Sequence, residues 1–179
     1  AIGTGIAIQP PDGRVLSDRA GEHRVGPAMV VTDEHVFQDD RPVGVMIETP
    51  AAAQTCDLMA SRVDFFCLGT NDLIQYYLVI DRTDKSVTHL YNPFHPAILR
   101  CLHQVYTLLQ YSGRPVTVCG EMAADPAAAA VLLGLGFTSL SMSLAAYPRM
   151  KEMIGSLNVG KLRELAGEIM KMEKPGDVE

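Results

Sequence analysis

The sequence has no apolar segment long enough to cross a membrane and no excess of positive charge. Its apolar runs fall well short of the roughly 18 residues that a transmembrane helix requires, and no charged-then-apolar signal segment opens the chain. The formal net charge is −6 over 179 residues, which gives no electrostatic basis for binding nucleic acid or an anionic membrane. We therefore expect a cytoplasmic protein without membrane insertion and without a nucleic-acid partner.

Cysteine pairs and complete glycine motifs are also absent. The cysteines are Cys56, Cys67, Cys101 and Cys119. They form no Cys-x-x-Cys pair, which argues against a zinc site or a disulfide framework and favours reduced thiols. Gly3-x-Gly5 lacks the third glycine and the following helix of a dinucleotide-binding fingerprint, so we expect no such site there.

What the chain does have is enough apolar material for a folded core. Hydrophobic residues make up 47% of the sequence, and the length suits one domain or one domain with an appendage. The first 43 residues differ from the rest, because 3–9 alternates like a strand, 10–13 is a turn signal and 14–16 suits the second strand of a hairpin. We expect a β-rich N-terminal extension over 1–43, the main domain over 44–173 and a polar tail over 174–179.

Strands and helices alternate after residue 43. Apolar runs predict strands over 43–47, 65–68, 114–119 and 139–143, and periodic segments predict helices over 51–61, 96–111, 126–133, 145–154 and 159–172. Gly134 is expected to end the third of these helices, and 73–95 is expected to be a long loop with short helical turns. Apolar strands separated by helices predict a parallel sheet. The fold class is therefore α/β, with four β/α units, half of the eight in a (β/α)8 TIM-type barrel.

Each predicted strand ends in polar or reactive side chains. These are Glu48, then Asn71 and Asp72, then Cys119 and Glu121, then Ser141 and Ser143. The carboxyl ends of parallel strands lie at one edge of a sheet, so we expect these groups to converge. Glu48 and Asp72 suit Mg²⁺, which prefers one or two carboxylates and leaves its other positions to water and substrate. The alternative is that both carboxylates only cap helices.

Two further residues have both a functional and a structural interpretation. Cys119 precedes Gly120, which permits close approach of a ligand, so its thiol suits a nucleophile or a general acid or base. A single cysteine is more often a small buried apolar residue. Arg82 suits a phosphate or carboxylate ligand, and the alternative is a solvated surface arginine.

Several segments together resemble a known family. They are 45–53 (VMIETPAAA), 64–82 with its Gly69-Thr-Asn-Asp72 turn, 118–123 (VCGEMA), 132–137 (LLGLGF) and 140–143 (LSMS). In order and spacing they resemble the PEP-utilising enzymes, most closely enzyme I (phosphoenolpyruvate-protein phosphotransferase) of the bacterial sugar phosphotransferase system. The resemblance covers about residues 43–172.

The resemblance implies a fold and a set of roles. The fold is the C-terminal half of the PEP-binding barrel. Glu48 and Asp72 would ligate Mg²⁺, and Asn71 and Arg82 would contact the phosphate of phosphoenolpyruvate. Cys119 would protonate the enolate carbon as pyruvate forms, with Gly120 lending backbone contact. The family also implies transport of sugar as the process served and the phosphocarrier protein HPr as a partner of the complete enzyme. We further expect a homodimer.

The sequence departs from the family pattern at several positions. Cys67 stands where a serine is usual, and Tyr77 and Val79 stand where small residues are expected. We expect these to be packing changes, and the alternative is that their bulk narrows the site. These 179 residues also contain no Thr-Ser-His phosphohistidine motif, no first half of the barrel and no HPr-docking domain. We therefore expect phosphoryl transfer to be incomplete in this chain alone.

Other interpretations stay open. Residues 1–20 faintly resemble a glucose-type IIA domain, without its active histidines, and chance similarity explains them equally well. A second hypothesis for the whole chain is a catalytically inactive half-barrel that acts only through self-association or a partner, because a half-barrel exposes sheet edges and an inner face. A third is a metal-dependent aldolase of another barrel family, which shares the carboxylate pair but has no need of the Cys119-Gly-Glu121 sequence.

Overall fold

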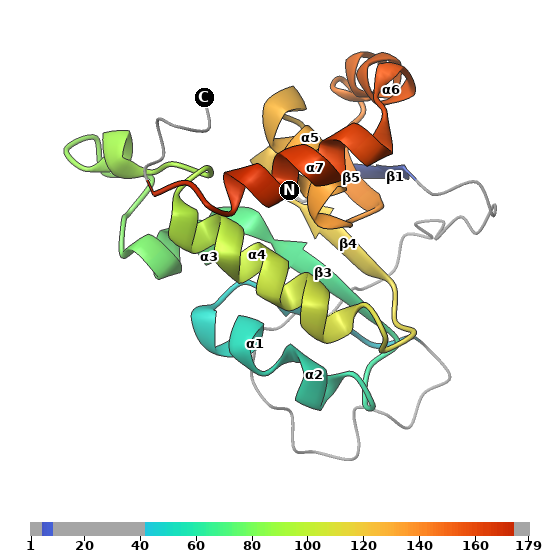
Figure 1. Ribbon diagram of the computed structural model, residues 1–179. Helices are drawn as coiled ribbons and strands as arrows, with labels where there is room; N and C mark the ends of the chain where they lie inside the picture. Colours follow the sequence, from blue (N-terminus) through green and yellow to red (C-terminus); the bar gives the residue numbers. More distant parts are fainter. Residues whose placement is uncertain (1–4, 9–41, 174–179) are drawn as a thin grey trace.

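A computed structural model of the chain describes residues 5–8 and 42–173. The strands form one sheet in the order β1-β5-β4-β3-β2 (Figure 1). Their bounds are β1 Gly5–Ile8, β2 Gly44–Ile47, β3 Phe65–Gly69, β4 Val116–Cys119 and β5 Ser139–Ser143. β2, β3, β4 and β5 are parallel, and β1 joins the outer side of β5 in the antiparallel direction. The predicted α/β class with four parallel strands is thus confirmed.

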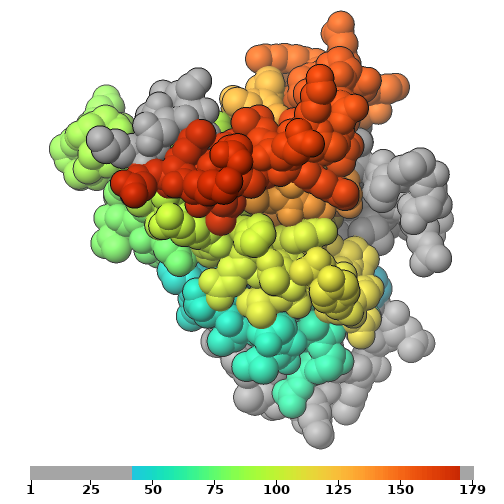
Figure 2. All heavy atoms as spheres, in the orientation of Figure 1, coloured from blue at the N-terminus to red at the C-terminus, as the bar shows by residue number. Residues whose placement is uncertain are grey.

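Helices follow the strands along the chain. The α-helices are α1 Pro50–Gln54, α2 Cys56–Met59, α3 Thr70–Leu78, α4 Pro96–Leu109, α5 Pro126–Leu135, α6 Tyr147–Ser156 and α7 Val159–Ile169, and the 3₁₀ turns are η2 Thr88–Leu90 and η3 Glu121–Ala123. Figure 2 shows α4 on the molecular surface between α1–α2 and α7. Within the described residues, no helix combines the length and apolar character that crossing a membrane requires.

The two faces of the sheet differ in burial. Side chains alternate between faces along a strand, and Phe66, Leu68, Val118 and Leu140 are almost fully buried. Figure 1 shows α1, α2 and α4 on one side of β3 and β4. Residues of the opposite face are only half-buried; we call this the open face, and its members are Met46, Phe65, Cys67, Thr117, Cys119, Ser139 and Ser141.

Helix α4 shows how the sequence directs the packing. Its apolar stripe, which includes Ile98, Leu102 and Val105, is fully buried. Burying each such side chain stabilises the fold by about 1.5–3 kcal/mol. The helix begins at Pro96, and the preceding His95 caps it by accepting a hydrogen bond at Nδ1 from the Ala97 amide, 3.1 Å away. The predicted helix over 96–111 is therefore confirmed.

Three predictions about the helices were wrong. The single helix expected over 51–61 is two short helices, because the backbone leaves the helical conformation at Thr55 (φ −124°, ψ 16°). The loop expected from residue 73 begins instead as part of α3, which buries Leu73 and Ile74. Gly134 does not end α5, which continues to Leu135.

Two glycines near the end of α5 have different roles. Gly136 has φ +109° and ends the helix, in the left-handed conformation that glycine adopts without strain. Gly134 lies inside α5 against α7, where a Cβ atom would stand 2.4 Å from the carbonyl oxygen of Leu162. The first glycine is required by conformation and the second by close packing.

The N-terminal predictions are only partly covered by the structure. The strand expected within 3–9 is present as β1, and it pairs with β5, Ile6 standing opposite Met142. The expected turn at 10–13, the hairpin strand at 14–16 and the polar tail at 174–179 lie outside the described residues. The domain boundaries and the resemblance of 1–20 to a IIA domain therefore stay predictions.

Candidate active site

Three parallel strands end side by side and present polar groups at one edge of the sheet. Glu48 follows β2 directly, Asn71 and Asp72 lie in the first turn of α3 after β3, and Cys119 is the last residue of β4. The register confirms the alignment, because Gly69 at the end of β3 is the partner of Cys119. The expected convergence of these strand ends is thus present.

The helix-cap interpretation of Glu48 is wrong. Thr49 is the N-cap of α1, and its hydroxyl oxygen accepts a hydrogen bond from the Ala52 amide at 3.2 Å. Glu48 lies one residue earlier and is no part of that cap. The N-cap position of α3 is taken by Gly69, so Asp72 lies beyond it, in the first turn. Glu48 is therefore left without a capping role, whereas Asp72 keeps a first-turn position in which a carboxylate stabilises a helix N-terminus.

The two carboxylates are close enough to affect each other. Partial burial raises the pKa of Glu48, and the negative charge of Asp72 raises it further. Glu48 also lies against Gly69, where a Cβ atom would be 3.3 Å from the Glu48 Cβ. Two negatively charged carboxylates repel each other, and a cation placed between them stabilises both.

Arg82 reaches the same edge from the loop after α3. Its guanidinium lies 4.0 Å from Asp72 Oδ1 and 3.9 Å from Glu121 Oε1. The arginine side chain is 39% exposed, so these ion pairs are solvated and weak on their own. Arg82 is thus a solvated surface arginine, as the alternative interpretation expected, and it also lies beside two carboxylates of the site, so its role toward a phosphate stays a prediction.

Hydrogen bonds join the ends of β3 and β4. The Thr70 hydroxyl donates to the carbonyl oxygen of Cys119 at 2.8 Å, and Asn71 Oδ1 accepts from the Glu121 amide at 2.9 Å. Gly120 lies between these bonds with φ +99°, and a Cβ atom there would be 2.5 Å from Thr70 Oγ1. The close approach expected at Gly120 is therefore made by the neighbouring turn of the protein itself.

Cys119 is half-buried, and its thiol is held in the protonated form. The thiol donates to the carbonyl oxygen of Leu68, 3.3 Å away. Burial raises the pKa of Cys119 to about 12, with further increases from Cys67 and Glu48. A thiol with this pKa keeps its proton at neutral pH, which suits a proton donor better than a nucleophile.

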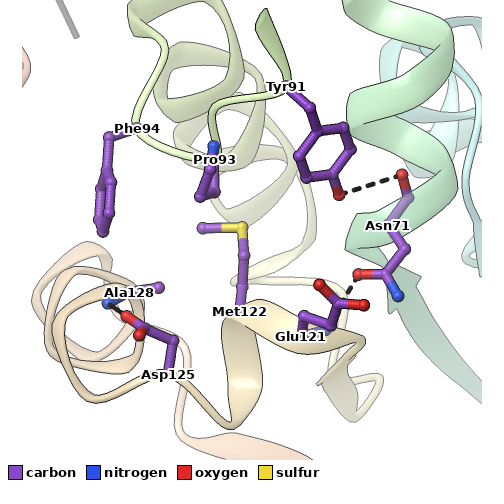
Figure 3. A pocket seen from close by; sticks show the side chains of 8 residues that line it. All are labelled: Asn71, Tyr91, Pro93, Phe94, Glu121, Met122, Asp125 and Ala128. Carbon is purple, nitrogen blue, oxygen red and sulfur yellow. Dashed lines mark hydrogen bonds between the residues drawn. The ribbon is translucent and has the colours of Figure 1, made fainter. Parts of the chain in front are cut away.

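A pocket of about 300 Å³ opens beside these groups (Figure 3). It is lined by Asn71, Tyr91, Pro93, Phe94, Glu121, Met122, Asp125 and Ala128. The Tyr91 hydroxyl donates to the backbone oxygen of Asn71 at 3.4 Å. Burial and the charge of Glu121 raise the pKa of Tyr91 to about 12, so this hydroxyl stays protonated. The pocket and the carboxylate edge share Asn71 and Glu121.

Sequence reasoning gave no role to several of these residues. Glu121 was identified only as a polar residue at a strand end, and Tyr91 and Met122 were not singled out. The one available signal for Tyr91 was its place in the Tyr91-Asn-Pro-Phe94 run of a long loop-like segment. In contrast, Ser141 and Ser143 pair with Ala7 and Gly5 of β1, and no hydrogen bond of the described residues joins them to Glu48, Asp72 or Arg82.

Two of the bulkier departures from the family pattern, Tyr77 and Val79, lie away from the pocket. Val79 is 90% exposed at the end of α3, so its side chain points into solvent. Tyr77 packs against the hydrophobic core. Neither is among the residues that line the pocket.

The donor set fits a hard divalent cation that takes few protein ligands. Within 42–173 no group of three or more His, Cys, Asp or Glu side chains converges as a metal site. Glu48 and Asp72 are two carboxylates, which is the usual number for Mg²⁺ when substrate and water complete its coordination. The pair therefore suits Mg²⁺ and lacks the ligands of a closed structural metal site.

These features define an α/β protein with a parallel four-strand sheet and a cluster of polar and charged side chains at its strand ends. Residues 26–159 match the family described as "PEP-utilising enzyme, PEP-binding domain". The chain therefore belongs to the PEP-utilising enzymes, as its motifs indicated.

Named relatives agree with this assignment. The chain is similar to the phosphoenolpyruvate-protein phosphotransferases of Buchnera aphidicola subsp. Schizaphis graminum (41% identity, 77% of this chain and 24% of the relative) and Haemophilus influenzae (39%, 80% and 25%). It is also similar to that of Staphylococcus carnosus (44%, 72% and 22%). The chain spans about a quarter of the length of these curated relatives.

Proposed function

We propose that this chain carries half of the (β/α)8 barrel that binds phosphoenolpyruvate in a phosphoenolpyruvate-protein phosphotransferase. Its family and its four parallel strands support this proposal. The observation that carries it is the grouping of Glu48, Asp72 and Arg82 with Cys119 at one edge of the sheet. Phosphoryl transfer needs mainly charge neutralisation and positioning, and these residues supply both.

The charged residues bind the phosphate end of the substrate. Glu48 and Asp72 hold Mg²⁺, which when bound withdraws negative charge from the phosphoryl oxygens. Arg82 exchanges its solvated pairs with Asp72 and Glu121 for the phosphate, and Asn71 supplies a further polar contact. Gly120, packed against Thr70 and Asn71, holds the end of β4 against α3, and its backbone is the further contact that we propose for the substrate. This arrangement neutralises charge as the phosphoryl group departs.

Cys119 acts on the other end of the substrate. Loss of the phosphoryl group leaves the enolate of pyruvate, whose terminal carbon takes a proton. The thiol of Cys119 is protonated at neutral pH and donates that proton, leaving a thiolate and pyruvate. In the reverse direction the thiolate removes the same proton.

Isothermal titration calorimetry with phosphoenolpyruvate and Mg²⁺ tests the proposal. We expect saturable heat for the unmodified chain, and at least about tenfold weaker binding for Arg82→Ala, because a charge-assisted contact to phosphate contributes about 1.5–3 kcal/mol. Arg100→Ala is the matched control, since Arg100 is an exposed arginine on α4. Absence of heat with a chain shown by circular dichroism to be folded contradicts the proposal.

Transfer of the phosphoryl group to protein is a separate step. We expect this 179-residue chain to bind substrate without becoming phosphorylated, because its sequence has no Thr-Ser-His motif to accept the group. HPr is accordingly a partner of the complete enzyme. Incubation with radiolabelled phosphoenolpyruvate tests this, and stable label on the isolated chain would show the expectation to be wrong.

A second proposal is that the chain acts through self-association. It is supported by the open face of the sheet and by β2, which lies at the end of the strand order with no further partner among residues 5–8 and 42–173. A homodimer is compatible with either proposal, because a dimer can also carry the substrate site.

A further inference from the structure

Two cysteines share the open face of the sheet next to the candidate active site. Cys67 of β3 stands opposite Thr117 of β4, and Cys119 stands opposite Gly69. Because residues two apart on a strand point to the same side, Cys67 and Cys119 are diagonal neighbours on one face. Both side chains are partly exposed and both thiols are free.

The sulfur of Cys119 lies toward the strand that holds Cys67. Its thiol donates to the carbonyl oxygen of Leu68, the residue after Cys67, at 3.3 Å. The negative charge of an ionised Cys67 is the second cause, after burial, of the raised pKa of Cys119. The two thiols are therefore near enough to interact across the strands.

A third sulfur completes the group. Met46 of β2 is the register partner of Cys67, so it lies on the same face. Its side chain extends over Gly69, where a Cβ atom would be 3.0 Å from Met46 Sδ. Gly69 is in turn the partner of Cys119. Met46 Sδ therefore lies at the small space that Gly69 leaves without a side chain, and the register places Cys67 and Cys119 on the same face of the sheet beside it.

Direct oxidation does not join the two cysteines easily. Diagonal neighbours on adjacent strands have Cα atoms roughly 7–8 Å apart, whereas a disulfide needs about 4.4–6.8 Å. An ion between the sulfurs removes this constraint, because each sulfur then bonds to the ion and not to the other sulfur.

We propose that Met46, Cys67 and Cys119 form a binding site for a soft monovalent cation of the Cu⁺ type. Thiolate and thioether ligands select such ions over hard divalent cations. Binding releases the two thiol protons and gives two sulfur–metal bonds to the cysteines and one to the methionine, without any oxidation or reduction. The carboxylate pair Glu48 and Asp72 lies beside this sulfur site. The carboxylates prefer the hard ion Mg²⁺ and the sulfur atoms prefer the soft ion Cu⁺, so each ion binds at its own site.

The site has a consequence that rests on the proposed function. In the proposed function Cys119 is the proton donor, and a thiolate bound to Cu⁺ has no proton to give. A soft cation at the sulfur site therefore blocks protonation of the enolate carbon. The binding measurement below uses no phosphoenolpyruvate, so it fails or succeeds independently of that function.

Competition for Cu⁺ tests the site. The reduced chain is titrated without oxygen against the coloured complex of Cu⁺ with bathocuproine disulfonate, and loss of colour measures transfer. We expect one Cu⁺ per chain. Cys67→Ser and Cys119→Ser are each expected to weaken binding by at least about tenfold, because each removes a direct thiolate ligand and loss of even an outer-shell partner costs about 10–100-fold. Met46→Leu, which conserves volume, is expected to weaken it to a smaller extent.

Buried residues of the same types provide the matched controls. Cys56 and Cys101 are 0% and 2% exposed, and Met153 is a partly buried methionine on α6. Cys101→Ala and Met153→Leu are expected to leave Cu⁺ binding unchanged. X-ray absorption of the Cu⁺-bound chain is expected to show sulfur neighbours only, one fewer in Met46→Leu. No transfer of Cu⁺ to the folded chain, or full binding by the Cys67→Ser, Cys119→Ser double variant, would overturn the proposal.

Discussion

Val79 has a backbone conformation that its side chain does not favour. It ends α3 with φ 56° and ψ 44°, the left-handed region in which β-branched residues are strained. The side chain is 90% exposed, so burial does not offset this strain. A valine in the sequence gives no signal for a left-handed backbone conformation, so the end of α3 was not predicted.

Replacing Val79 by glycine is expected to stabilise the protein. Glycine relieves the strain of the left-handed conformation, and its greater freedom in the unfolded chain removes part of the gain, which leaves about 0.5–1 kcal/mol. Urea unfolding measures the difference. Val159→Gly is the matched control, because Val159 is a half-exposed valine at the start of α7. Its replacement should lower the free energy of unfolding by about as much as Val79→Gly raises it. A Val79→Gly chain less stable than the unmodified one contradicts the explanation.

The raised pKa of Cys119 predicts a loss of stability in alkaline solution. The folded thiol has a pKa of about 12 against an ordinary value of 9.0, so the unfolded chain ionises first. The contribution of the protonated thiol is fully present below about pH 9 and is lost as the pH rises toward about 12. We expect the free energy of unfolding of the unmodified chain, relative to Cys119→Ser, to fall between about pH 8 and pH 10.5. A constant difference across that range would show that the thiol is not desolvated.

At the scale of elements, the α5–α7 contact depends on the absence of a side chain. A Cβ atom at Gly134 would stand 2.4 Å from the Leu162 carbonyl oxygen and 3.0 Å from the Ala166 Cβ. We expect Gly134→Ala to cost about 1–3 kcal/mol, because helix backbone must move to accept the methyl group. Thermal unfolding measures this cost.

Gly167 on α7 is the control for that change. A Cβ atom there meets nothing within 4 Å, so Gly167→Ala should stabilise the helix by about 0.5–1 kcal/mol. The two substitutions are chemically identical and lie in a contacting pair of helices, so opposite signs isolate the effect of packing. Equal effects would mean that α5 and α7 separate readily.

How well an element could be predicted depends on whether the local sequence pattern or tertiary packing determines it. The stripe of α4 is periodic over 14 residues, and its start is marked by Pro96, so its existence and its start followed from the sequence, while its end at Leu109 comes two residues before the predicted one. α3 begins immediately after β3, and its first residues are the polar Thr70, Asn71 and Asp72, which look like a loop. The strand-end residues of the site followed from parallel topology. The pocket did not, because Tyr91 and Met122 meet only through tertiary packing.

At the scale of the molecule, one side of the sheet is far less buried than the other. Phe66, Leu68 and Val118 are fully buried against helices, whereas Cys67, Thr117 and Ser139 on the open face are partly exposed. The β5 side of the sheet is continued by β1, while β2 ends the strand order in the described part of the chain. Unpaired strand edges and open sheet faces favour association with another chain.

We therefore expect the chain to self-associate through the open face. Light scattering should give a mass above the 19.4 kDa of one chain, rising with concentration. Thr117→Lys places a charge on the open face and should shift the population toward monomer, since desolvating a lysine in an interface is costly. Thr107→Lys on the exposed side of α4 is the matched control and should associate like the unmodified chain. A single-chain mass at every concentration would contradict self-association, and equal loss of association in both variants would place the contact elsewhere than on this face.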